Sequence, residues 1–264
     1  MSLSFACIAA HTPLLIPTIG REGLERIAKT KEAMTALEQE FYLAQPDTAV
    51  VITPHAHGLP DSMTMNCSPS YSANFEEFGD LATKGKWRSD TLMIDRIRED
   101  FKAKHLPLTL DSVENLDYGS AVPLWYLTQH LPKVRIVSIQ VSGLDAKSHY
   151  EFGRQLKDEI MISTKRVAVI ASADLSHRAG ENSPRGFSPR GVAYDEKVSA
   201  AVRDGRLAEM VDIDDEWSAE AEACGAKVLA MLAGVMDGVQ HESSVLSYEK
   251  PFGVGYLVAS LKVA

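Results

Sequence analysis

Short apolar runs rich in β-branched residues alternate along this chain with longer segments of helical periodicity. The apolar runs cover residues 4–10, 48–54, 62–67, 134–141, 166–172, 243–248 and 254–262, and their length and composition are typical of buried strands. The helical patterns cover residues 21–44, 89–104, 120–131, 145–162, 191–204 and 216–236. Strands that alternate with helices predict an α/β fold, with a central mixed β-sheet and helices packed on both faces.

The segments between these elements indicate a single domain over residues 1–264. No internal repeat, low-complexity block or linker divides the chain. Residues 68–88 and 178–191 lack a clear period and are expected to be irregular. The second segment holds three glycines and two prolines directly after His177, which is typical of a loop that borders a site.

Charge and composition narrow the class of partner. The formal net charge of the 264 residues is −9, which argues against nucleic acid and anionic membrane surfaces. No apolar run is long enough to span a bilayer, and Met1 to Ser4 lack the basic start of a signal peptide. Three widely separated cysteines favour reduced thiols in a cytoplasmic protein. The sequence leaves open whether the chain forms a homo-oligomer.

Three of the predicted strands end on histidine. Residues 5–10 run into His11, residues 49–53 into His55 and His57, and residues 167–172 into Asp174 and His177. Ligands of α/β proteins bind at the carboxyl edge of the sheet, and imidazole is a preferred ligand of divalent iron and zinc. We therefore expect a metal site at this edge. His55 is the preferred ligand of its pair, because it lies nearer to the strand end.

An anionic ligand has to come from another element. The predicted helix near Trp217 carries Glu220, Glu222 and Cys224. Acidic residues in a first turn also serve the helix dipole, and Cys224 also fits a small buried apolar position, so both interpretations stay open. Asp174 lies three residues before His177, where it either orients an acid–base imidazole or forms a turn.

Familiar motifs of other enzyme classes do not occur. The chain has no Gly-x-Ser-x-Gly nucleophile elbow, which weakens a serine hydrolase interpretation. It also has no Gly-x-Gly-x-x-Gly and no Gly-Lys-Ser/Thr loop, so nucleotide binding has no support.

Six short motifs in a fixed order give the chain a family resemblance. They begin at His11 (HTPLLIP), Ile52 (ITPH), Leu116 (LDYGSAVPL), Ala171 (ASADLSH), Ala223 (ACG) and Ser247 (SYEKPFGVGY). With these motifs the chain resembles the class III extradiol ring-cleavage dioxygenases, the family of the protocatechuate-cleaving catalytic subunit. The likeness is nearest to the AmmeMemoRadiSam and Memo-like branch. It covers essentially the whole chain and implies a single α/β domain.

The resemblance also implies roles for individual residues. His11 and His55 would bind a non-haem Fe(II), or zinc or another divalent metal as isolated, with Glu222 or Cys224 as the third ligand. His177 would be the acid–base residue, with Asp174 beside it. Tyr118 stands where relatives commonly carry a histidine, and its phenol can still donate a hydrogen bond to bound oxygen.

The leading interpretation is thus an Fe(II)-dependent oxidoreductase that opens a catechol ring with O₂. Tyr71, Phe75 and Phe78 are candidates to line its entrance. The alternative is a Memo-like metal-binding protein without ring cleavage, active in redox chemistry or as a binding module. A zinc hydrolase at the same site is a third class.

Overall fold

A computed structural model describes residues 2–56 and 58–263, which leaves His57 outside the described residues. The described residues form an α/β fold with a mixed sheet of ten strands, and the main path of this sheet runs β4-β5-β7-β2-β8-β1-β10-β9. The strands are β1 (Leu3–Ala9), β2 (Thr48–Thr53), β3 (Met63–Asn66), β4 (Ser70–Phe75), β5 (Asp80–Ser89), β6 (Leu108–Asp111), β7 (Arg135–Gln140), β8 (Val167–Ser172), β9 (His241–Glu249) and β10 (Tyr256–Val263). The predicted fold class is confirmed.

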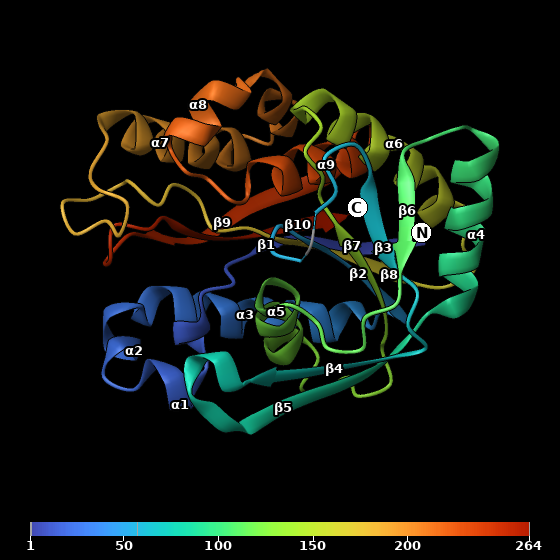
Figure 1. Cartoon of the computed structure of the whole chain (residues 1–264), viewed down its shortest axis with the longest axis horizontal. Coiled ribbons are helices and arrows are strands. Elements are labelled where there is room, and N and C mark those ends of the chain that lie inside the picture. The colour runs from blue at the N-terminus through green and yellow to red at the C-terminus, as the bar shows by residue number, and fades with distance from the viewer. Residues whose placement is uncertain (1, 57, 264) are drawn as a thin grey trace.

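Helices cover both faces of the sheet (Figure 1). One layer contains α3 and α5, which pack against β1, β2, β8, β9 and β10. The opposite layer contains α9, which contacts β8, together with α6, which packs against α9, and α4, which contacts α6. The helices are η1 (Pro13–Leu15), α1 (Pro17–Gly20), α2 (Gly23–Arg26), α3 (Ala28–Ala44), η2 (Glu76–Phe78), α4 (Thr91–Ala103), α5 (Tyr118–Leu127), α6 (Ala146–Met161), α7 (Pro189–Arg203), η3 (Leu207–Asp212), α8 (Asp215–Glu220) and α9 (Ala226–Met236).

The alternation of side chains along the strands divides the core in two. In β1, Phe5 and Cys7 belong to the cluster under α3 and α5, whereas Ala6 and Ile8 belong to the cluster under α6 and α9. Side chains of successive strand residues point to opposite faces. The central strands are therefore apolar on both sides, which is why they were recognisable as continuous apolar runs.

The centre of the sheet is parallel, and this brings the predicted site residues together. β7, β2, β8 and β1 are mutually parallel neighbours, so the ends of β1, β2 and β8 lie along one edge. Ala9 of β1 stands opposite Ser172 of β8. His11 and the segment after β8 thus leave the sheet side by side, as expected for the carboxyl ends of parallel strands.

The expectation of an irregular segment over residues 68–88 is wrong. This segment forms the antiparallel pair β4 and β5, in which Tyr71 and Trp87 face the core and the opposite positions are polar. The strands escaped detection because β5 (DLATKGKWRS) is largely polar and contains no apolar run. The strand β6 (LTLD) was also missed, because an alternation of only four residues is too short to recognise.

Two predicted helices are interrupted. The pattern over residues 21–44 contains α2 and α3, separated by Ile27, and the pattern over residues 216–236 contains α8 and α9. Between α8 and α9, Glu222 adopts a left-handed backbone with a φ of 49°. Glu222 and Cys224 therefore lie in a turn, and the assumption that they share a helix is wrong.

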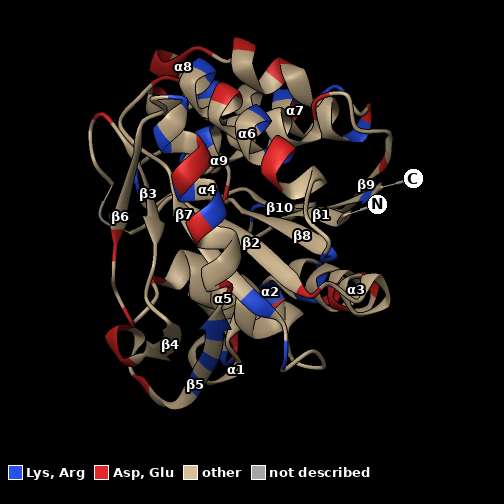
Figure 2. Ribbon diagram, turned by 90° about the vertical axis from the view of Figure 1, so that its right-hand side faces the viewer, with Lys and Arg blue, Asp and Glu red and all other residues tan. Residues whose placement is uncertain are grey.

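Basic and acidic residues are unevenly distributed over the surface. Lys and Arg colour much of β5, and acidic residues are prominent on α8 and near α7 (Figure 2). Within the described part of the chain, no helix is both long and apolar enough to cross a membrane.

Candidate metal centre

Three side chains from separate parts of the chain meet at the carboxyl edge of the sheet. His11 follows β1, His55 follows β2, and Cys224 lies in the turn before α9; their potential ligand atoms all lie within 4.8 Å of one another. The Nε2 atoms of the two histidines are 2.9 Å apart, and Cys224 Sγ lies 3.5 Å from His11 Nε2. This group is the candidate metal centre of the described residues.

A hydroxyl group on the neighbouring strand fixes the imidazole of His11. Ser172 Oγ donates to the carbonyl oxygen of Gly119 and lies 3.0 Å from His11 Nδ1. Because the only hydrogen of Ser172 Oγ is used on Gly119, this hydroxyl accepts from His11 Nδ1–H. The lone pair of His11 is thereby placed on Nε2, toward His55 and Cys224, as a metal ligand requires.

His55 is held by the start of α5. Its ring stacks on Tyr118, with the centroids 4.4 Å apart, and its backbone N–H donates to Thr53 Oγ1. Gly119 allows this close approach, because a Cβ atom there would lie 2.6 Å from Thr53 Oγ1 and 3.1 Å from His55 Cδ2. A side chain at position 119 would displace the ring.

The turn that carries Cys224 is fastened to the segment after β8. The N–H of Gly225 donates to the carbonyl oxygen of Asp174, and the N–H of His177 donates to that of Ala221. A Cβ on Gly225 would lie 2.5 Å from the Cβ of Ala173, so this approach also depends on glycine. The carboxylate of Glu222 instead pairs with Arg185 Nε at 3.2 Å. The turn thus presents the thiol to the histidines and turns Glu222 to the surface.

Burial favours the uncharged form of all three groups when no metal is bound. It lowers the pKa of His11 to about 3, and burial together with the neighbouring His11 lowers the pKa of His55 to about 4. Both imidazoles are therefore neutral at pH 7. Burial raises the pKa of the Cys224 thiol, and the nearby Asp174 raises it further. Cys224 would lose its proton on binding a metal cation.

Two of the three separations in this group fit a common metal ion. Two imidazole nitrogens that bind one metal at about 2.1 Å lie roughly 3.0–3.4 Å apart, and a thiolate at about 2.3 Å lies roughly 3.1–3.6 Å from such a nitrogen. The observed separations of 2.9 and 3.5 Å are close to these values. Two neutral nitrogens and one thiolate form a donor set suited to iron, zinc or copper.

Asp174 and His177 border the cluster. Asp174 accepts from the backbone N–H of His11 at 3.1 Å and lies 3.5 Å from His11 Nε2 through its second oxygen; its contacts thus go to His11 rather than to His177. Burial raises the pKa of Asp174 to about 7. The Nε2 atom of His177 is buried and has no hydrogen-bond partner among the described residues. Such an atom is unusual in a folded protein and needs a partner such as water or a bound ligand.

The aromatic residues expected at an entrance lie in different places. Phe78 contacts the ring of Tyr118, with the centroids 5.4 Å apart, so it lies beside the cluster. Tyr71 and Phe75 are buried in the core under α5, and the expectation that they line an entrance is wrong. Burial raises the pKa of the Tyr118 phenol, with Cys224 as a further cause, so Tyr118 is a neutral hydrogen-bond donor.

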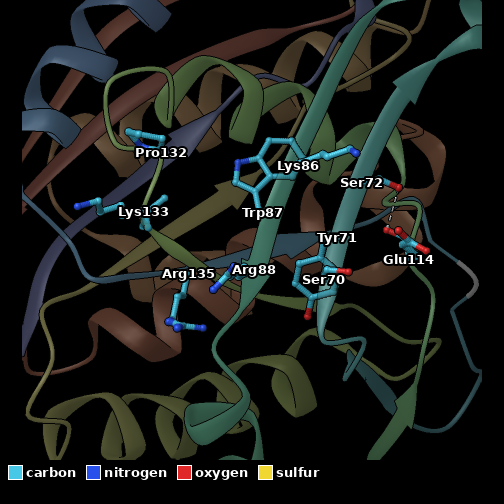
Figure 3. Close-up of a pocket in the computed structure, with 11 residues that line it drawn as sticks. Ser70, Tyr71, Ser72, Lys86, Trp87, Arg88, Glu114, Pro132, Lys133 and Arg135 are labelled. Carbon is cyan, nitrogen blue, oxygen red and sulfur yellow. Dashed lines mark hydrogen bonds between the residues drawn. The ribbon is translucent and has the colours of Figure 1, made fainter.

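Two cavities differ in their relation to this centre. A cavity of about 210 Å³ is lined by His55 and Asp117 together with polar residues of β3 and β7. A separate groove of about 670 Å³ between β4, β5 and the start of β7 is basic: Lys86, Arg88, Lys133 and Arg135 gather around it (Figure 3). The basic groove contains none of the three cluster residues, so we do not place the reaction there.

Comparison with known proteins shows the family to which the chain belongs. A family model described as the catalytic LigB subunit of aromatic ring-opening dioxygenase matches residues 5–259, and the chain belongs to this family. The protein CA_C1420 of Clostridium acetobutylicum is 27% identical over an alignment of 271 positions, which covers 99% of this chain and 58% of that protein. The chain therefore spans little more than half the length of this relative.

A solved structure shows a similar fold. The crystal structure of the uncharacterized protein JW3007 from Escherichia coli K12 covers 86% of this chain and 91% of its own, with a TM-score of 0.64 and 16% sequence identity. At this identity the likeness concerns the fold alone.

Sequence reasoning missed the residues that orient the ligands. Ser172, Thr53 and Gly119 carry none of the usual signs of catalytic chemistry, yet they fix both imidazoles. Ser172 and Thr53 are the last residues of β8 and β2, and all three lie within the motifs of the family resemblance. That resemblance assigned them no role.

Proposed function

We propose that this protein binds one divalent metal, Fe(II) in the active form, and uses it to open the ring of a catechol with O₂. The observation that supports this most is the convergence of His11, His55 and Cys224 at the sheet edge, in a chain of the ring-opening dioxygenase family. All three cysteines are free, which suits a reducing compartment such as the cytoplasm.

In this proposal the three side chains hold the metal through two neutral nitrogens and one anionic sulfur. The anion supplies the single negative charge that a carboxylate supplies in a two-histidine, one-carboxylate site. When bound, iron would allow the electrons of a coordinated diol to reach O₂. Glu222 is not part of this set, because it pairs with Arg185 at the surface.

His177 is the residue that we propose to move protons. Its unpartnered Nε2 is available to take a proton from a substrate hydroxyl and to return one to an oxygen atom later. An imidazole suits both steps because its ring nitrogens can accept a proton and donate one. Tyr118, a neutral phenol against His55, would donate a hydrogen bond to substrate or to O₂.

Turnover under air tests the proposal. Protein purified without oxygen and loaded with Fe(II) is mixed with a panel of catechols, while O₂ uptake and the yellow, ring-opened product are followed. We expect uptake of one O₂ per product formed. The absence of product with every catechol, from protein with a full metal content, would contradict the proposal.

One observation favours a second function, which is metal-dependent redox chemistry without ring cleavage. Cys224 places an oxidisable thiol where a ring-opening enzyme would use a carboxylate. In this case O₂ would oxidise the thiol rather than a catechol. Mass spectrometry of the aerobically treated protein would then find oxygen added to the peptide that contains Cys224, with no ring-opened product.

A further inference from the structure

Four polar side chains form a buried block on one face of the sheet beside His55. Thr64 and Asn66 of β3 stand opposite Gln140 and Ser138 of β7. Residues two apart in a strand share a face, so all four point the same way. They are 4–8% exposed. Polar residues at such positions are costly unless they meet a partner.

Two members of this block carry a side-chain oxygen without a partner among the described residues. Thr64 Oγ1 and Gln140 Oε1 are buried without a hydrogen bond among the described residues. By contrast, the side chain of Asn66 bonds to the backbone of Ser68 and Val113. Asn66 is thus a structural residue, whereas Thr64 and Gln140 carry unpartnered oxygens and belong to the lining of the cavity of about 210 Å³.

The remaining lining gives this cavity a negative character. Asp111, Asp117 and Glu77 line it, and the described lining residues include neither Lys nor Arg. Asp117 accepts hydrogen bonds from Thr53 and from the backbone and hydroxyl of Ser120. An anionic group here would face like charges without a counter-ion.

We infer that the cavity binds a protonated amine carried by the aromatic substrate, and that Thr64 and Gln140 select for it. An ammonium group offers three hydrogen-bond donors and one positive charge, which match the unpartnered oxygens and the surrounding carboxylates. His55 belongs both to the cavity lining and to the metal cluster, so an amine in the cavity places the attached ring beside the metal. This inference rests on the proposed function for the identity of the ring.

Equilibrium binding of three phenols separates this inference from the proposed reaction. Tyramine, 4-ethylphenol and 4-hydroxyphenylacetate share one ring and differ in charge, and none of them has the second hydroxyl needed for ring opening. Calorimetric titration of the metal-free and zinc-loaded protein should give the tightest binding for tyramine, at least tenfold tighter than for 4-hydroxyphenylacetate. Equal affinities, or tighter binding of the carboxylate, would overturn the inference.

Substitutions localise the binding. Thr64→Val and Gln140→Met keep the approximate volume and remove the polar atoms, and each should weaken tyramine binding at least fivefold with unchanged metal stoichiometry. Thr109→Val is the matched control, since Thr109 pairs with Thr64 across β3 and β6 but is exposed and bonds to Ser62. Tyramine binding that survives both substitutions would place the amine elsewhere and contradict the inference.

The outcomes of the two proposals remain distinct. If no catechol is opened but tyramine binds and depends on Thr64 and Gln140, the reaction fails and the amine site stands. If catechols are opened and the three phenols bind equally, the reaction stands and the amine site fails. Since the comparison of ligands uses the unmodified protein, it remains decisive even if a substituted protein does not fold.

Discussion

The tautomer of His11 depends on one hydroxyl group. Ser172 accepts from His11 Nδ1 because its own hydrogen is donated to Gly119, and this leaves Nε2 unprotonated. The two histidines themselves could be predicted from the sequence, because each directly follows an apolar strand. Ser172 could not, since nothing in a local pattern tells which strand-terminal hydroxyl meets which ring.

Replacing this hydroxyl should weaken metal binding without unfolding the protein. In Ser172→Ala the imidazole of His11 loses the partner that fixes its orientation, and such outer partners are typically worth about 10- to 100-fold in metal affinity. Competition titration with a metal chelator measures the effect. Ser260→Ala, which removes another buried hydroxyl on β10, is the control and should retain full affinity.

His177 should affect turnover far more than metal binding. His177→Gln removes the imidazole that we assign to proton transfer, and such a residue contributes about 10²- to 10⁴-fold to rate. We expect kcat to fall within this range while the metal content stays at that of the unmodified protein. Metal analysis showing loss of iron in this variant would mean that His177 is a ligand instead.

At the scale of elements, the approach of α5 to β2 positions His55. Gly119→Ala would put a methyl group within 3.1 Å of both Thr53 Oγ1 and His55 Cδ2. We expect lower metal affinity and a lower melting temperature, measured by chelator competition and by thermal unfolding. Gly23→Ala is the control: a Cβ there meets only Phe252, at 3.9 Å, and both quantities should stay near those of the unmodified protein.

Some elements of the fold could be predicted from the sequence, whereas others could not. The buried parallel strands β1, β2 and β8 could be predicted from their continuous apolar runs. The edge at which they end could be predicted from the histidines that follow them. The polar strand β5 could not be predicted, because it packs through isolated residues such as Trp87. The break between α8 and α9 is a tertiary effect, because Gly225 packs directly against Ala173 and Asp174. The sequence pattern predicted one helix that continues through Glu222 and Cys224, the two candidate anionic ligands. In the structure both residues lie in the turn between α8 and α9.

At the scale of the whole molecule, one buried carboxyl ties α7 to β9 and to the segment after β8. Asp195 accepts from Tyr248 Oη at 2.7 Å and from the backbone N–H of Ser176 at 2.8 Å. Burial is the largest influence on this group and raises its pKa to about 6. The folded protein therefore holds this proton more tightly than the unfolded chain, in which an Asp has a pKa of about 3.9.

This difference predicts a pH dependence of stability. Between about pH 4 and pH 6 the unfolded chain loses the proton of Asp195 while the folded protein keeps it, so Asp195 makes the free energy of unfolding fall as the pH rises, by up to about 1.4 kcal/mol per pH unit. Asp195→Asn removes this contribution. Denaturant unfolding at several pH values should find a slope in the unmodified protein that is reduced in the variant; identical slopes would contradict the assignment.

The central claim is that His11, His55 and Cys224 together hold one metal, and the Co(II)-loaded protein tests it most directly. A thiolate bound to Co(II) gives an intense charge-transfer absorption in the near ultraviolet, which carboxylate and imidazole ligands do not give. We expect this absorption at one Co(II) per chain in the unmodified protein and in Glu222→Ala, and its loss in Cys224→Ser. Absorption that persists in Cys224→Ser, or is lost in Glu222→Ala, would contradict the account.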